Sequence, residues 1–300
     1  MSDTLEYLDE ILESQTLKKD SDEIENLNLR RSEVESLLRD EFGAKPIIKY
    51  GGSMVKNTMI RELYDLDIIC FWRYDDDSGG KNLEEIYKNV QKVLATKYDA
   101  QEKRSAIRIQ TLDLNNHIDL HIDVVPGRYS DDKKEDAFLH QTMGDKKHIK
   151  TNPQIHINCI KNSGLLDEIR LLKLWKIRNG LQDVKTFVIE LLTLKLLENT
   201  KINELDQRLI YILEQLIEQK GKLTVQDPAN PNGNDLSELL NSGIQHNLAS
   251  FAENTLNIIE SHGWLEVFGS LKDINEEKNI NIITNAASSI KKPLKPWLEI

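Results

Sequence analysis

Cysteine is scarce in this sequence of 300 residues: only Cys70 and Cys159 are present. Neither belongs to a CxxC pair or a Cys/His cluster, which excludes a disulfide framework and a structural zinc site. Long apolar runs are also missing, since none approaches the roughly 18 residues that a membrane span requires. The N-terminal stretch MSDTLEYLDEILESQ is acidic, unlike the basic start of a secretory signal. We therefore expect a cytoplasmic protein that is neither secreted nor embedded in a membrane.

Basic residues are fewer than acidic residues in this sequence. The sequence holds 39 Lys and Arg against 50 Asp and Glu, which gives a formal net charge of −11. Such a chain repels polyanions, so strong binding to nucleic acid is not expected. Repeats and low-complexity tracts are absent, and the 39% hydrophobic content suits a soluble globular protein of one large or two ordinary domains.

The spacing of apolar residues divides the chain into three parts. Residues 1–42 place them at helical intervals and predict a helical lead-in. Residues 43–152 alternate short strand-like runs with a helical pattern, which predicts a mixed sheet with helices. Residues 153–300 are mainly helical, and Asn152 before Pro153 is a typical helix start with Asn as the cap. The expected fold class is α+β, with a helical C-terminal lobe.

Two features of the middle part concern strand pairing. The alternating runs IRIQTLDL and HIDLHIDVV are separated by Asn115 and Asn116, which predicts a β-hairpin. After Pro126, the stretch YSDDKKEDAFLHQTMGDKKHIKT is polar and charged, and we expect it to be a connector to the helical lobe.

The stretch GGSMVKNTMIRELYDLDIICFW holds the first candidate site. In a strand, side chains two apart point to the same face, so Asp65 and Asp67 are presented together. Two adjacent carboxylates repel each other, and paired oxygen ligands suit two Mg²⁺ ions, for which Mn²⁺ can substitute. Gly51, Gly52 and Ser53 form a turn whose backbone N–H groups, with a helix starting near Met54, make an anion cradle. Phosphate beside a divalent metal is the expected occupant.

A third carboxylate comes from the hairpin. In HIDLHIDVV, Asp119, His121 and Asp123 alternate with apolar residues and share one face. Strands about 4.8 Å apart bring carboxylates close enough to bridge two metal ions, and Asp123 is our candidate.

Each piece also has an ordinary explanation. A Gly-Gly-Ser turn is common, a DxD pair is usually solvated or caps another element, and Asp119 and His121 also suit the solvated face of a hairpin. The ordered combination of glycine turn, helix, double aspartate before a buried strand, and a later strand with a further aspartate is what favours a site.

These motifs resemble a known family. GGSMVKNT, DLDIICF and HIDVVPGR are similar to the pattern of the polymerase-β-type nucleotidyltransferases, which is GS, then DxD, then a third Asp on a later strand. IRLLKLWKIRNGL, KTFVIELLTLKLL and VQDPANPNGNDL follow in order, and this succession resembles the oligoadenylate synthetases and the bacterial CD-NTases related to cyclic GMP-AMP synthase. The resemblance covers roughly residues 45–240. It implies a polymerase-β-like core, a helical lobe and an active site in the cleft between them.

The resemblance also assigns roles to residues. It implies that Asp65, Asp67 and Asp123 hold the metals and that Gly52 and Ser53 hold the β- and γ-phosphates. Lys173 matches the family lysine that reaches the triphosphate from the helical lobe; an exposed lysine on an amphipathic helix is the ordinary alternative.

Three further residues complete the implied nucleotide site. Thr186 and Phe187 match the residues that approach the phosphates and stack on the donor base. Phe187 replaces the usual Tyr, which keeps the stacking face but removes the hydroxyl, and it is also interpretable as core. Lys56 falls where relatives have a basic residue near the substrate, although it equally suits a solvated helix face.

The resemblance implies a bacterial, cytoplasmic enzyme that joins nucleoside triphosphates, ATP among them, into a cyclic or linear oligonucleotide signal for anti-phage defence. A regulatory protein partner from the same operon is part of that expectation. The zinc insertion of cyclic GMP-AMP synthase is absent, and the acidic balance argues against the RNA-binding face of oligoadenylate synthetase. Two alternatives stay open: a nucleotidyltransferase acting on a tRNA end, a small molecule or a protein, and an inactive binding module, which the three intact aspartates disfavour.

Overall fold

The computed structural model describes residues 3–18, 21–110 and 122–270. Its elements are α1 (Asp3–Gln15), α2 (Asp22–Phe42), β1 (Ile47–Tyr50), α3 (Gly52–Lys56), β2 (Leu66–Trp72), α4 (Leu83–Leu94), β3 (Asp99–Glu102), β4 (Ile107–Gln110), β5 (Ile122–Tyr129), β6 (Ala137–His140), β7 (His148–Thr151), α5 (Pro153–Lys161), α6 (Leu166–Arg178), α7 (Thr186–Leu197), α8 (Leu205–Glu218), the 3₁₀ turn η1 (Ser237–Leu240), α9 (Ser242–His262) and α10 (Trp264–Phe268). Within these ranges, no helix combines the length and apolar character needed to cross a membrane.

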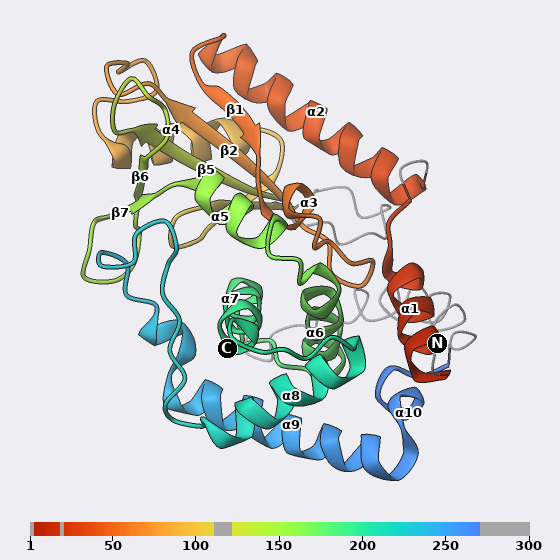
Figure 1. Cartoon of the computed structure of the whole chain (residues 1–300). Coiled ribbons are helices and arrows are strands. Elements are labelled where there is room, and N and C mark those ends of the chain that lie inside the picture. The colour runs from red at the N-terminus through yellow and green to blue at the C-terminus, as the bar shows by residue number, and fades with distance from the viewer. Residues whose placement is uncertain (1–2, 19–20, 111–121, 271–300) are drawn as a thin grey trace, which may run out of the picture.

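A mixed sheet and a group of helices make up the molecule, which confirms the expected α+β class. The sheet has the order β1-β2-β5-β4-β3, with β6 and β7 continuing beside β5. Strands β2 and β5 are parallel, and the other pairs are antiparallel. In Figure 1 the sheet and α2 lie in the upper part, helices α6 to α10 lie below, and α3 and α5 lie between them.

Strand β2 divides its side chains between the two faces of the sheet. Leu66, Ile68, Cys70 and Trp72 enter a core that α2 and α4 cover. Ile69 and Phe71 belong to a smaller cluster on the opposite face, together with residues of β5 and β6. Because side chains alternate along a strand, Asp67 lies on that second face, the one nearer α3 and α5.

The predicted hairpin is confirmed where the structure describes it. Strands β4 and β5 pair antiparallel, with Ile107 opposite Val124 and Arg108 opposite Asp123. The expected turn at Asn115 and Asn116 lies outside the described residues. The helix start at Asn152 is also confirmed, because the Asn152 side chain accepts hydrogen bonds from the first turn of α5.

The connector expected after Pro126 is wrong, since it contains β6, β7 and the end of β5. Pro126 is tolerated inside β5 because this strand pairs with β4 only up to Val124 and with β6 only from Gly127. On the edge of β5 away from β2, where Cys70 is its partner, Pro126 lies between these two pairings, so its missing N–H costs no ladder bond to β4 or β6. Ala137 and Leu139 are buried on one face of β6, although charged residues surround them in the sequence.

The N-terminal helices pack in different places. Residues Leu8, Ile11 and Leu12 of α1 join the core of the helical lobe, whereas Leu27, Val34 and Leu38 of α2 join the core under the sheet. The predicted lead-in is therefore helical, and its two halves contribute to two different cores.

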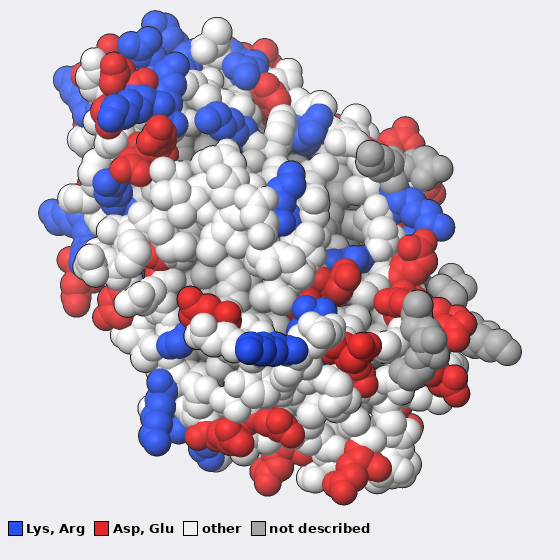
Figure 2. All heavy atoms as spheres, in the orientation of Figure 1, with Lys and Arg blue, Asp and Glu red and all other residues white. Residues whose placement is uncertain are grey.

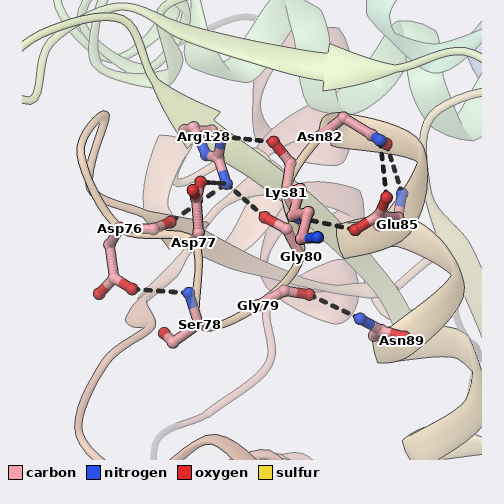
Figure 3. Close-up of polar contacts among 10 residues, drawn as sticks. All are labelled: Asp76, Asp77, Ser78, Gly79, Gly80, Lys81, Asn82, Glu85, Asn89 and Arg128. Carbon is pink, nitrogen blue, oxygen red and sulfur yellow. Dashed lines mark hydrogen bonds and ion pairs between the residues drawn. The ribbon is translucent and has the colours of Figure 1, made fainter.

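A loop at the far end of β2 is fixed by one arginine (Figure 3). Arg128, near the end of β5, donates hydrogen bonds to the backbone carbonyls of Asp76, Gly80 and Lys81 and forms an ion pair of 3.0 Å with Asp77. The guanidinium thus neutralises the acidic loop and satisfies three of its carbonyl groups. This loop lies at the opposite end of β2 from Asp65 and Asp67.

Candidate active site

The glycine turn lies directly against the carboxylate of Asp67. Gly52 has a positive φ of 65°, which favours glycine, and a Cβ atom at this position would lie 1.7 Å from Asp67 Oδ2. Next to it, the backbone N–H of Gly51 donates to the carbonyl of Asp67 at 2.9 Å. The turn therefore gives α3 its start and brings the backbone close to an acidic side chain. Ser53 follows inside α3, which ends at Lys56.

Two of the three carboxylates, Asp67 and Asp123, lie on neighbouring strands, as predicted. Asp67 pairs in register with Asp123, and Asp65 comes immediately before β2. Burial, then the charges of Asp123 and Asp65, raise the pKa of Asp67 to about 7. Arg108 of β4 completes the row, because its Nε and Nη2 donate to both oxygens of Asp123 at 2.8 and 2.7 Å. Asp123 is thus already paired with a cation.

The carboxylate oxygens of Asp65, Asp67 and Asp123 are ligands of the kind that a hard divalent cation prefers. Their spacing in this structure is a separate matter. Among the described residues, no three His, Cys, Asp or Glu side chains converge closely enough to hold a metal ion. Asp67 is nonetheless desolvated and close to other carboxylates, a combination that a cation would stabilise. The ion pair of Asp123 with Arg108 would compete with a cation for the same carboxylate.

Two lysines share one buried glutamate at the base of the site. Glu190 of α7 is 1% exposed; its Oε2 lies 2.5 Å from Lys56 Nζ and its Oε1 lies 2.8 Å from Lys173 Nζ. Thr58 Oγ1 also donates to Glu190, at 3.1 Å. Burial disfavours the ionised form of Glu190, but the two ammonium groups outweigh it and lower the pKa of this carboxyl. The two lysines thus exceed the single glutamate by one positive charge.

The two lysines differ in what they can still bind. Lys173 Nζ donates to the carbonyl and the hydroxyl of Thr58 and pairs with Glu190, which uses all three ammonium protons. Lys56 Nζ pairs with Glu190 and lies 5.9 Å from the centre of the Phe187 ring. Among the described residues it has no other hydrogen-bond partner, so Lys56 retains donors for a ligand. Neither lysine lies on a solvated helix face, since Lys56 is 9% and Lys173 1% exposed.

One pocket of about 160 Å³ unites most of the predicted residues. Figure 2 shows the molecule in the orientation of Figure 1, and residues other than Lys, Arg, Asp and Glu dominate the middle of this face. The pocket is lined by Gly52, Ser53, Lys56, Asp65 and Asp67 from the sheet side, by Lys173, Thr186, Phe187 and Glu190 from the helical side, and by Leu63. Of the predicted site residues, Asp123 alone is missing from this lining; Asp119 and His121 lie outside the described residues.

Sequence reasoning missed Glu190 and Arg108. Glu190 stands in the nearly uniform apolar run TFVIELL, where a charged residue must find a partner, and this was the available signal. For Arg108, the signal was the predicted hairpin. Arg108 precedes Asn115 by seven residues and Asp123 follows Asn116 by seven, so a turn there places them opposite each other.

The fold is similar to that of solved bacterial proteins, although no protein-family model and no curated protein matches the sequence. CdnC from Escherichia coli MS115-1, solved with ATP, is 19% identical with a TM-score of 0.64, over 89% of this chain and 97% of that chain. CdnG from Bradyrhizobium diazoefficiens, a CD-NTase solved with GTP, is 13% identical with a TM-score of 0.66, over 96% of this chain and 99% of that chain.

This chain has the CD-NTase fold. DncV from Vibrio cholerae, a cyclic AMP-GMP synthase solved with the linear intermediate pppA(3′,5′)pG, agrees with this, at 19% identity and a TM-score of 0.60 over 89% of this chain and 80% of that chain. CdnC has also been solved in a complex with HORMA-deltaN. In this CD-NTase fold, the pocket lies between the sheet and the helical lobe, where the resemblance of the motifs placed it.

Proposed function

We propose that this chain is a nucleotidyltransferase that joins nucleoside triphosphates, with release of pyrophosphate, into a cyclic di- or trinucleotide or a short oligonucleotide. One observation carries the proposal: residues predicted from separate motifs of the sheet and of the helical lobe line a single pocket. The nucleotides bound to CdnC, CdnG and DncV support it, because those proteins share the fold over most of this chain.

The proposed reaction is an in-line displacement at phosphorus. A ribose hydroxyl oxygen of one nucleotide bonds to the α-phosphorus of the other, the bond to the oxygen bridging the β-phosphate breaks, and pyrophosphate leaves. We assign the proton of the hydroxyl to Asp123, the carboxylate that the resemblance places nearest the nucleophile. Asp65, Asp67 and Asp123 would hold Mg²⁺, and the bound ion would supply charge neutralisation for the phosphates.

The remaining residues bind and orient the donor triphosphate. Ser53, in the first turn of α3, presents its backbone N–H and hydroxyl to phosphate oxygens. Lys56 contributes the free donors of its ammonium group, and Thr186, at the first position of α7, adds a hydroxyl. The ring of Phe187 offers a face on which a base stacks. In this arrangement Lys173 does not contact the phosphates; it holds Glu190 and Thr58 in place.

The proposal includes a regulatory protein partner and a biological role. The complex of CdnC with HORMA-deltaN supports the expectation of a protein partner, and the resemblance supports a signalling role in anti-phage defence in the bacterial cytoplasm. An alternative nucleotidyltransferase, with a tRNA end, a small molecule or a protein as acceptor, would use the same donor site and differ in the second substrate.

The test is product formation from purified protein with all four ribonucleoside triphosphates and Mg²⁺, followed by phosphatase treatment and mass spectrometry. We expect a phosphatase-resistant oligonucleotide from the wild type and none from Asp67→Asn. Asp75→Asn is the matched control, because Asp75 lies in an exposed ion pair with Arg73, remote from the pocket. Pyrophosphate release that requires an added RNA, protein or metabolite acceptor would favour the alternative, and a fully active Asp67→Asn variant would refute both.

A further inference from the structure

A second cavity adjoins the polar pocket and differs from it in chemistry. It measures about 260 Å³ and shares Gly52, Lys56, Asp67 and Phe187 with the polar pocket. Away from these shared residues, its walls are mainly aliphatic and aromatic side chains of β2, β5, β6 and α5. The polar side chains on that side are Thr151 and His156. An apolar slot that opens onto a phosphate-binding pocket suits a nucleobase.

His156 is held in this wall by a buried carboxylate. Its Nε2 lies 2.6 Å from Oδ1 of Asp227, the first residue of the DPANP sequence, whose side chain is only 6% exposed. Asp227 is itself fixed, because it accepts from the backbone N–H of Ala229 at 2.9 Å and from Asn234 Nδ2 at 2.6 Å. Burial opposes the ionisation of Asp227, but the hydrogen bonds from His156 and Asn234 outweigh it and lower the pKa of this carboxyl. The loop therefore sets the orientation of one imidazole.

The same imidazole touches the aromatic wall. The rings of His156 and Phe187 have centroids 5.1 Å apart and are tilted by 57°. Since the Asp227 carboxylate is an acceptor, Nε2 carries the proton of this contact. Nδ1 forms no hydrogen bond with any residue in the described ranges, so it remains available to a ligand beside Phe187. An aromatic face accepts every base, and only a fixed polar atom at its edge discriminates between bases.

We propose that His156 determines which base is accepted in the apolar cavity and that Asp227 is the residue that positions it. The inference rests on the proposed function and deepens it. In this arrangement the DPANP loop fixes the His156 ring, which contacts the edge of the base, and Phe187 supplies the stacking surface. The ligand is a nucleoside triphosphate whose base lies in the cavity and whose phosphates reach Lys56.

The test is equilibrium binding of the α,β-methylene analogues of ATP, GTP, CTP and UTP in the presence of Mg²⁺. For the wild type we expect a clear preference among the four. His156→Phe keeps a ring against Phe187 but removes both nitrogens, and it should reduce this preference by about five- to tenfold, the worth of a single hydrogen bond. Asp227→Asn should reduce it in the same direction. Asp235→Asn should leave the preference unchanged, because Asp235 is exposed in the same loop and accepts from the Ser237 N–H.

Each outcome of this binding experiment either supports or overturns the inference. A preference that is unchanged in His156→Phe, while the wild type binds nucleotides, overturns this inference and leaves the proposed function intact. A uniform loss of affinity for all four analogues would show that His156 acts only as packing, and it also overturns the inference. A wild-type protein that binds none of the analogues would overturn the proposed function and this inference with it. If Asp227→Asn does not fold, His156→Phe still provides the decisive comparison.

Discussion

Asp67 is the residue whose electrostatics are most informative. Its pKa is raised from 3.8 to about 7 by burial, then by Asp123 and Asp65. A carboxyl group with a raised pKa binds its proton more tightly in the folded state. The stability that this proton provides is complete below about pH 4 and is lost as the pH rises through about 7.

We predict that without metal ions the melting temperature of the wild type falls between about pH 5 and pH 8 relative to that of Asp67→Asn, which cannot ionise. Thermal unfolding in a chelator across this range measures the difference. Asp75→Asn, in an exposed ion pair, should follow the wild type. Parallel curves for wild type and Asp67→Asn would show that the Asp67 carboxyl titrates normally.

Arg108 gives a second prediction at this scale. Because it donates to both oxygens of Asp123, Arg108 would compete with a metal ion for that carboxylate. We expect Arg108→Gln to bind Mn²⁺ about tenfold more tightly than the wild type, since a charge-assisted contact no longer has to break. Titration calorimetry measures this, with Arg104→Gln as control, because Arg104 forms an exposed pair with Glu238. Weaker binding would mean that Arg108 is needed to hold Asp123 in place.

At the scale of elements, the glycine turn before α3 is the most constrained feature of the site. Gly52 combines a positive φ with the Asp67 carboxylate, whereas Gly51 has an extended backbone and would place a Cβ atom 3.3 Å from the flexible end of Ile69. We predict that Gly52→Ala loses nucleotide binding and about 1–3 kcal/mol of stability. Gly51→Ala should be tolerated in both respects. Thermal unfolding with and without ATP distinguishes them, and equal tolerance of the two changes would mean that the turn can shift.

The strands also show what the sequence could and could not predict. Strand β2 is a continuous apolar run after Asp67, and β5 begins with apolar residues on either side of Asp123, so the positions of both strands, and the proximity of Asp67 to Asp123, followed from the pattern. Strands β6 and β7 have four residues each and are surrounded by charged residues, so their apolar pattern is too short to be recognised as a strand. They exist because β5 continues beyond Pro126 and offers an edge, which is a tertiary effect.

At the scale of the whole molecule, three hydrophobic cores hold the parts of the chain that line the pocket. One core packs α1 with the helices from α6 onward, and the others lie on the two faces of the sheet. The resemblance of the motifs predicted a cleft between these parts. It did not predict the buried contact across it, in which Glu190 of α7 binds Lys56 and Thr58 from the sheet side, because that pairing depends on the relative placement of distant segments.

Glu190 therefore links stability to ligand binding. Removing its charge leaves two buried ammonium groups without a counter-ion, so Glu190→Gln should lower the free energy of unfolding by about 3 kcal/mol. A bound triphosphate brings negative charge to Lys56, so ATP analogue should raise the melting temperature of Glu190→Gln more than that of the wild type.

Glu168→Gln is the matched control for this prediction. Glu168 is also 1% exposed and paired with an arginine, Arg208, but both residues of that pair belong to the helical lobe. Its replacement should destabilise the protein and leave the thermal gain on nucleotide binding at the wild-type value. If both variants gained equally from the nucleotide, the Glu190 contact would be a packing device without connection to the phosphates, and Lys56 would have to bind its ligand while still paired with Glu190.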